Sequence, residues 1–131
     1  HRDLHYPLRR QRQMCIRDRL NAALSGNSKF FFGSDSAPHL KNRKFNEFCC
    51  AGVYSTKYSV SNILELFYTS KKSNNLNKFL TINGCKHYNL KFDNTLISYS
   101  RKKDFTFKKY SKFKNDSLIN YNHFKNYWSK N

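Results

Sequence analysis

The stretch "FFFGSDSAPHLKNRKFNEFCCAG", residues 30–52, decides the fold prediction for this chain. Its first residues belong to a short run, "KFFFG", which is apolar on both faces, as a covered strand of a parallel sheet would be. The preceding "LNAALSG" predicts the last turns of a helix closed by Gly26. Helix, short loop and buried strand form the repeating step of an α/β fold. We therefore expect that fold class, with a strand that ends just before Asp35.

The position of Asp35 and His39 after this strand suggests a functional site. In α/β proteins the residues just beyond the carboxyl ends of the strands face the ligand. A carboxylate there can bind a metal ion or move a proton, and a histidine four residues later can bind an anionic substrate. An Asp-Ser pair after a strand also forms helix caps and Asx-turns, so the spacing alone leaves both interpretations open.

The net charge of the chain is strongly positive and allows a second class of function. Lys and Arg number 25 against 8 Asp and Glu, which gives +17. Such a charge favours a polyanionic partner, and interleaved aromatic residues would suit a small basic nucleic-acid-binding protein. The lysines are spread along the whole chain, however, and the wealth of Lys, Asn, Phe and Tyr is typical of an AT-rich genome. We expect most lysines to be solvated surface residues.

Residues 1–19, "HRDLHYPLRRQRQMCIRDR", differ in composition from residues 20–131. They hold six Arg and no Lys or Asn, whereas the remainder holds two Arg, 17 Lys and 16 Asn. The string "MCIRDR" also resembles a translated sequencing adaptor. We interpret residues 1–19 as a foreign segment from sequence assembly and exclude them from functional reasoning, although a basic arm for nucleic acid is the alternative.

Two amphipathic helices and one strand are predicted in the rest of the chain. "SVSNILELFYTSK" predicts a helix capped by Ser59, and "SNNLNKFLTINGC" predicts a second that ends at Asn83-Gly84. The apolar stripes of the two helices consist of Val60, Ile63, Leu64 and Phe67, and of Leu76, Phe79 and Leu80. "DNTLISYSRKK" alternates as a solvent-facing strand does, and we expect an irregular tail anchored by Trp128.

The cysteine spacing does not predict a zinc-ribbon site, and the hydropathy pattern does not predict a membrane-spanning helix. Cys15, Cys49, Cys50 and Cys85 form no CxxC pair, so we expect buried free thiols in a reducing cytoplasm. No stretch reaches 18 apolar residues, so no transmembrane helix is expected, and no signal peptide is evident.

The motif "FFFGSDSAPH", followed by "CAG" at residues 50–52, resembles the last barrel strand and following loop of the dihydroorotases, the bacterial-type enzymes of pyrimidine synthesis. The family pattern is close to F-[LF]-G-[TS]-D-S-A-P-H, a basic loop with K-E, and C-A-G. The resemblance continues through "NKFLTINGCKHYNLKFDNTLI" and becomes loose after Arg101. It implies that residues 20–131 are a C-terminal fragment of a TIM (β/α)8 barrel.

The resemblance also implies a role for each matching residue. Asp35 matches the aspartate that binds metal and acts as acid and base, and His39 matches the histidine that binds the substrate carboxylate. Ala51 matches a loop alanine that contacts substrate through its backbone. Two zinc ions supply Lewis acid chemistry in the family, which interconverts N-carbamoyl-L-aspartate and dihydroorotate reversibly. A cytoplasmic homodimeric enzyme with a small-molecule substrate, and with no membrane or nucleic-acid partner, is implied.

The chain also departs from the family pattern. Phe45 replaces a glutamate, and Phe48 and Cys49 replace the Cys-Gly of the loop. The His-x-His pair, the carboxylated lysine and two further histidines of the family have no counterpart here, since His87 and His123 match no ligand position. We therefore expect this chain alone to be inactive. Another amidohydrolase-type metal enzyme is a further possibility, because a strand-end aspartate occurs in many such barrels.

Overall fold

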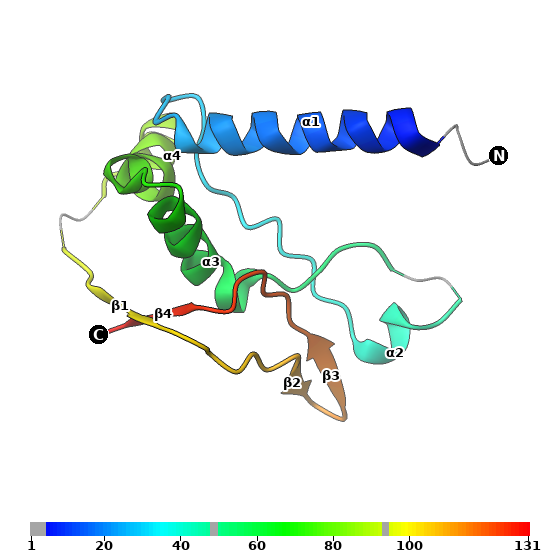
Figure 1. Cartoon of the computed structure of the whole chain (residues 1–131). Helices are drawn as coiled ribbons and strands as arrows, with labels where there is room; N and C mark the ends of the chain where they lie inside the picture. The colour runs from blue at the N-terminus through cyan, green and yellow to red at the C-terminus, as the bar shows by residue number, and fades with distance from the viewer. Residues whose placement is uncertain (1–4, 48–49, 93–94) are drawn as a thin grey trace. The chain divides into compact units, whose positions relative to one another are not determined.

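The computed structural model describes residues 5–47, 50–92 and 95–131, and for residues 5–14 it describes the backbone only. The chain divides into two compact units, residues 1–32 with 70–93 and residues 33–69 with 94–131. The elements of the first unit are α1 (His5–Leu24), η1 (Ser73–Asn75), η2 (Lys78–Ile82) and α4 (Asn83–His87). The second unit contains α2 (Lys41–Lys44), α3 (Thr56–Thr69), β1 (Tyr99–Lys102), β2 (Tyr110–Phe113), β3 (Asp116–Ile119) and β4 (Tyr127–Lys130) (Figure 1).

Helix α1 ends as the sequence predicts. Gly26 has a φ of 75°, the left-handed conformation that glycine adopts without steric cost at a helix end. A side chain at Gly26 would also lie 2.6 Å from the side-chain oxygen of Asn75, whose amide nitrogen donates to the Leu24 carbonyl at 2.9 Å. α1 is continuous across residues 19 and 20, where we predict that the foreign segment ends.

The second predicted helix is formed, but it does not end at Asn83-Gly84. It runs as a 3₁₀ turn, a π-helical segment and the α-helical turn α4, which continues to His87. Asn83 is buried, and its amide donates to the carbonyls of Asn27 and Phe30 at 3.0 and 2.9 Å. The Asn-Gly pair therefore packs against the preceding segment instead of forming a turn, because the buried amide has partners there.

The predicted strand at "KFFFG" is not formed among the described residues. The Phe32 amide donates to the Phe79 carbonyl at 2.9 Å, and the Phe30 carbonyl accepts from Asn83. The ring of Phe32 lies 6.3 Å from that of Phe79. A strand needs a neighbouring backbone for its alternate amides and carbonyls, whereas here the segment finds its partners on a helix. The prediction of a buried parallel strand is therefore wrong for this chain by itself.

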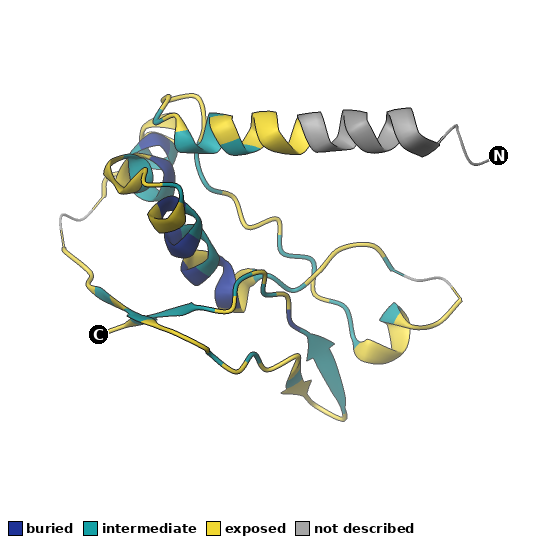
Figure 2. Cartoon of the chain, viewed as in Figure 1, coloured by how far each residue is buried: buried dark blue, intermediate teal, exposed yellow. Residues whose placement is uncertain are grey.

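Helix α3 forms the core of the second unit, and its buried face differs from the predicted stripe. Leu64 and Phe67 are buried as expected, but Val60 is exposed and Tyr58 is buried in its place. Tyr58 packs against a cluster of aromatic rings, those of Phe105, Phe107 and Tyr127. These rings come from distant parts of the sequence, so the rotation of the helix could not be read from its own periodicity (Figure 2).

Ser59 is not the cap of α3, because the helix already begins at Thr56. The Ser59 hydroxyl instead donates to the Thr56 carbonyl at 3.0 Å, inside the first turn. Ser55, which precedes the helix, and Ser36 from the preceding segment supply the polar contacts at this end.

The tail of the chain is more regular than the sequence predicts. β1 pairs with β4, and β2 pairs with β3, both antiparallel. β1 covers only the end of the predicted "DNTLISYSRKK" strand, of which Asp93 and Asn94 lie outside the described residues. The prediction of an irregular tail is wrong because β1 supplies the partner strand for β4. Trp128 lies on β4 and is an anchor, as expected: its indole N–H donates to Glu65.

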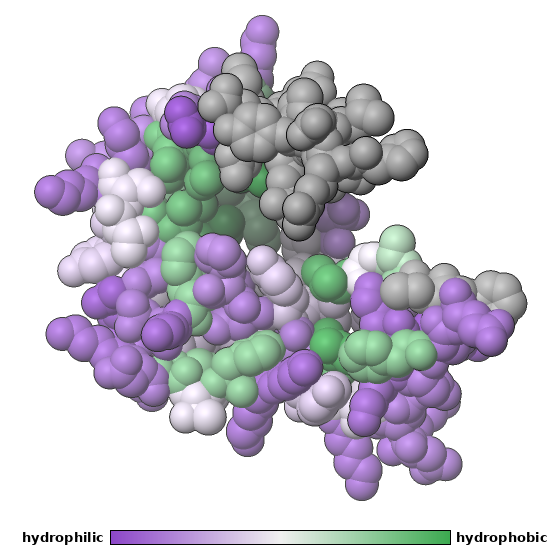
Figure 3. Space-filling model, turned by 45° about the vertical axis from the view of Figure 1, so that its right-hand side comes forward, coloured by the Kyte–Doolittle hydropathy of each residue, from purple (hydrophilic) through white to green (hydrophobic). Residues whose placement is uncertain are grey.

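Polar residues dominate the surface. Figure 3 shows hydrophilic residues over much of the visible face, as expected for dispersed lysines. Cys15 is exposed, contrary to the prediction of buried thiols, because α1 leaves its side chain in solvent, and Cys50 and Cys85 are only half-buried. Cys49 lies outside the described residues. No helix in the described ranges has the length and apolar character needed to cross a membrane.

Candidate active site

Asp35 lies in an extended segment that follows the three phenylalanines, and its backbone has an unusual conformation. Its φ is 41°, in the left-handed region that few residues other than glycine adopt. The side chain is exposed. Asp tolerates this region better than most residues, and Lys71, Asn89, Asp104 and Lys114 also have a positive φ, so the conformation alone does not mark a functional site.

Hydrogen bonds on both sides of Asp35 hold this conformation. The Ser36 hydroxyl oxygen accepts from the amides of Ser55 and Thr56 at 3.2 and 3.4 Å, and the Ser55 hydroxyl donates to the Ser34 carbonyl at 3.0 Å. Ser36 thereby satisfies amide groups at the start of α3, which would otherwise lack a partner within the helix. The two residues that flank Asp35 are tied to the beginning of this helix.

The segment with Ala51 lies beside the segment with Asp35. The Ala37 amide donates to the Val53 carbonyl at 2.9 Å. Gly52 has a φ of 96°, and a side chain there would lie 2.5 Å from the Ala37 side chain. Only glycine allows this approach, so the "AG" pair that the sequence singled out places Ala51 next to the "SDSAPH" segment.

β3 and the residue that follows it pair with the far ends of both segments. Leu40, next to His39, forms an antiparallel bridge with Leu118, and Tyr54 forms a parallel bridge with Asn120. Asn120 is buried, and its amide donates to the Lys108 carbonyl at 2.7 Å. His39 itself is half-buried and bonds to no other described residue. The half-buried position leaves part of the His39 side chain accessible to solvent.

A cavity of about 410 Å³ lies close to this region but is not at the predicted site. Its walls consist of Leu40, Asn42, Phe113, Lys114, Asn115 and Asp116. None of Asp35, His39 and Ala51 lines it, so the cavity does not mark the substrate position.

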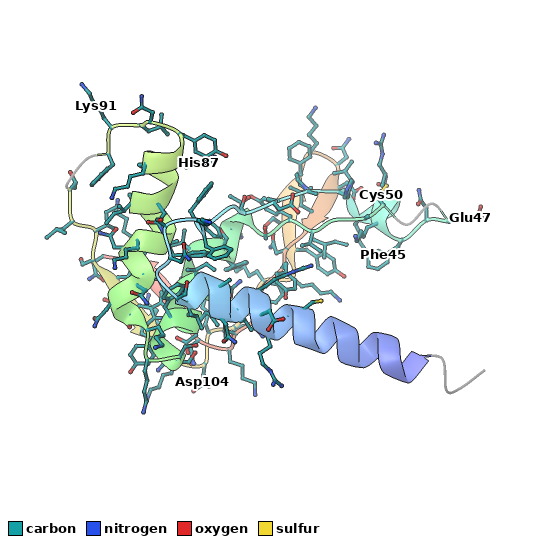
Figure 4. The ribbon with its side chains drawn as sticks, turned by 90° about the horizontal axis from the view of Figure 1, so that it is seen from above. Phe45, Glu47, Cys50, His87, Lys91 and Asp104 are labelled. Atoms are coloured by element: carbon teal, nitrogen blue, oxygen red, sulfur yellow. The ribbon has the colours of Figure 1, made fainter. Side chains whose placement is uncertain are left out.

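Lys44 at the end of α2 bonds to the loop and was missed by the sequence analysis. Its ammonium group donates to the carbonyls of Cys50 and Gly52, both at 2.6 Å. Phe45, the departure from the family pattern, is exposed and points away from these contacts, and Figure 4 shows it on the loop with Glu47 and Cys50. Lys44 matches the lysine of the K-E pair in the family pattern, but the sequence does not show that its ammonium group bonds to these carbonyls. Phe48 and Cys49, the other departures, lie outside the described residues.

Glu65 is the second residue that sequence reasoning missed. It is only 1% exposed, and Arg101 donates to both of its carboxylate oxygens at 2.5 and 2.8 Å. Trp128 and Asn126 each donate to it at 2.8 Å. These donors, Arg101 first, outweigh the opposing effect of burial and lower the pKa of Glu65 to about 2. The signal in the sequence is an acid within the apolar part of an amphipathic helix.

The described residues do not by themselves complete a metal centre. No three His, Cys, Asp or Glu side chains in the described ranges are close enough to hold an ion. A zinc site normally has at least three protein ligands, whereas Asp35 offers one exposed carboxylate.

The comparisons with known proteins point to one family, although no family model matches the chain. A dihydroorotase of Aliivibrio fischeri is 45% identical over 71 residues, which are 54% of this chain and 21% of the relative. This chain is similar to the dihydroorotases over the matched residues. The resemblance predicted from "FFFGSDSAPH" and "CAG" is thereby confirmed.

Solved dihydroorotases also resemble the structure. The enzyme of Saccharomyces cerevisiae in complex with 5-fluoroorotic acid matches 86% of this chain with a TM-score of 0.71 and 31% identity. The enzyme of Campylobacter jejuni matches 82% with a TM-score of 0.64 and 31% identity. The chain spans 32% and 30% of these proteins. The matched part thus spans about a fifth to a third of each dihydroorotase, and a nucleic-acid-binding function gains no support.

Proposed function

We propose that this chain supplies one part of the active site of a dihydroorotase, a cyclic amidohydrolase that interconverts N-carbamoyl-L-aspartate and dihydroorotate. The observation that carries this proposal is the linked pair of segments around Asp35 and Ala51. Hydrogen bonds of Ser36, Ala37 and Ser55 join them. Three residues that the family uses on substrate or metal are thus on two neighbouring backbone segments.

Each of these residues has a chemical task in the proposal. Asp35 is exposed, so its carboxylate can hold one metal ligand position and accept or return a proton at the reacting amide. His39 bonds to no other described side chain and binds a carboxylate of the substrate. Ala51 presents its main chain, and its small side chain permits close approach. Zinc, when bound in the complete enzyme, supplies the Lewis acid, with its other ligands outside the described residues.

We place this segment at the C-terminal part of a TIM barrel, in a cytoplasmic homodimeric enzyme. The partial coverage of the solved dihydroorotases supports this placement, because the chain matches about a third of each. The match of "FFFGSDSAPH" to the last barrel strand and following loop of the family also supports it.

A genetic complementation experiment tests the proposal. The matching segment of the Aliivibrio fischeri relative is replaced by residues 20–131, and the chimera is expressed in a bacterial strain that lacks dihydroorotase and requires pyrimidine. We expect growth without pyrimidine, and no growth when the chimera carries Asp35→Asn or His39→Ala. Asp104→Asn is the matched control, because Asp104 is an exposed aspartate outside the two segments.

The complete 131-residue chain, expressed without the rest of an enzyme, should not restore growth. Equal growth of the Asp35→Asn and Asp104→Asn chimeras would contradict the assignment of Asp35. Failure of the unsubstituted chimera, when it is expressed and folded, would contradict the proposed function itself.

A further inference from the structure

The carbonyl groups of the residues before and after Ala51 accept hydrogen bonds from the same lysine side chain. Cys50 precedes Ala51 and Gly52 follows it, and both of their carbonyls accept from the Lys44 ammonium group at 2.6 Å. Lys44 is half-buried, while its neighbour Arg43 is exposed. One side chain from α2 therefore fixes the backbone on both sides of the residue that we assign to substrate contact.

The chemistry of lysine suits this arrangement. An ammonium group has three donors and no acceptor, so it can serve two converging carbonyls at once. Hydrogen bonds from a charged donor are shorter and stronger than those between neutral groups. The glycine at position 52 has a positive φ and gains no rigidity from a side chain, so the loop needs an external contact to keep one conformation.

The Ala51 main chain lies between groups that are held in place. Its N–H and C=O form no hydrogen bond with any of the described residues, whereas the groups before, after and opposite it are bonded. A main-chain group whose neighbours are fixed in this way is suited to recognise a ligand, since much of the cost of ordering it has already been met.

We infer that Lys44 is a positioning residue, which holds the Ala51 main chain in the geometry that binds the substrate. This inference rests on the proposed function. Lys44 acts through the loop and does not itself touch the substrate. Its loss should therefore weaken substrate binding with little effect on the chemical step.

Amide hydrogen exchange of the complete 131-residue chain tests the contact. Lys44→Met should raise the exchange rates of the Ala37 and Ser55 amides about tenfold, because these amides bond across to the other segment and the loop loses the two Lys44 hydrogen bonds that hold it there. Lys44→Arg keeps a charged donor and should retain most of the protection. Arg43→Met, an equal change of charge on the same helix, should leave these rates unchanged. Unchanged exchange in Lys44→Met would overturn the inference.

Steady-state kinetics of the chimera described above tests the positioning. Lys44→Met should raise KM about tenfold with kcat within about twofold, whereas Arg43→Met should change neither. A lowered kcat at constant KM in Lys44→Met would overturn the inference while leaving the proposed function intact. Activity that is insensitive to Asp35→Asn would instead overturn the proposed function, and with it the role of Lys44.

Discussion

At the scale of single residues, small polar contacts surround Asp35 at the proposed site. Asp35 has a left-handed backbone, and Ser36 links the next position to the start of α3. The acid–base role proposed for position 35 explains why an aspartate stands there, whereas the hydrogen bonds of its neighbours fix its backbone conformation. The sequence indicated Asp35 and His39 by their spacing, while the serine contacts join residues about 20 positions apart and have no local signature.

Replacement of Ser36 by alanine should destabilise the chain by about 1 kcal/mol, the usual effect of losing a helix-capping acceptor. The amides of Ser55 and Thr56 would lose their partner. Urea denaturation followed by circular dichroism measures the free energy of unfolding. Ser28→Ala is the control, because Ser28 is exposed in a loop. Equal stabilities of the two variants would show that the Ser36 contacts do not stabilise the fold.

Replacement of Glu65 by glutamine should have a larger effect, about 3 kcal/mol, because Arg101 would be left without its ion partner. The side chain of Arg101 is 24% exposed, so solvent can partly solvate its unpaired charge. The loss of stability should therefore not exceed about 3 kcal/mol. The double variant Glu65→Gln with Arg101→Met should lose less than the sum of the two single variants. Additive losses in a denaturant series would contradict direct coupling between the two side chains.

At the scale of elements, α3 is fastened to the β1–β4 ribbon by the bonds of Glu65. The carboxylate on α3 binds Arg101 on β1 and Trp128 on β4. The Ser61 hydroxyl also accepts from the Trp128 amide at 2.8 Å. The amphipathic pattern predicted the helix, but it could not predict an ionic anchor on the buried face, because the partners lie more than 30 residues away.

This anchor should make the docking of the ribbon sensitive to acid. The pKa of Glu65 is lowered from 4.5 to about 2, so its stabilising contribution is complete above pH 4.5 and is lost as the pH falls towards 2. The contribution amounts to roughly 3 kcal/mol. Trp128 is the single tryptophan, so its fluorescence during denaturation at several pH values reports on this contact. In Glu65→Gln the free energy of unfolding should no longer fall between pH 4.5 and 2. If it still falls, the acid sensitivity comes from other carboxylates.

The contact between the two segments of the proposed site predicts that alanine substitutions at two glycines will differ strongly in their effect on stability. Gly52→Ala forces a side chain to within 2.5 Å of Ala37 and into a positive φ, so it should destabilise the chain by more than about 1 kcal/mol. Gly33→Ala is the matched control, because no atom lies within 4 Å of the added carbon. Thermal denaturation compares them, and equal melting temperatures would contradict the close packing of Gly52 on Ala37.

At the scale of the whole molecule, the sequence predicted the family correctly but predicted only part of the architecture. The end of α1 at Gly26 and the existence of two helices were predictable from local rules. The strand at "KFFFG" and the rotation of α3 were not, since each depends on partners distant in the sequence. The antiparallel pairing of the tail depends in the same way on which segments meet, as Tyr99 with Lys130 shows.

The central claim is that this chain contributes Asp35 and its neighbours to a dihydroorotase active site. Turnover of N-carbamoyl-L-aspartate by the purified chimera tests it most directly, with ring closure followed by absorbance. We predict measurable turnover that falls at least about a hundredfold in Asp35→Asn, as the loss of an acid–base group requires. Turnover that is equal in the two proteins, or absent in a folded and zinc-supplied chimera, would contradict the claim.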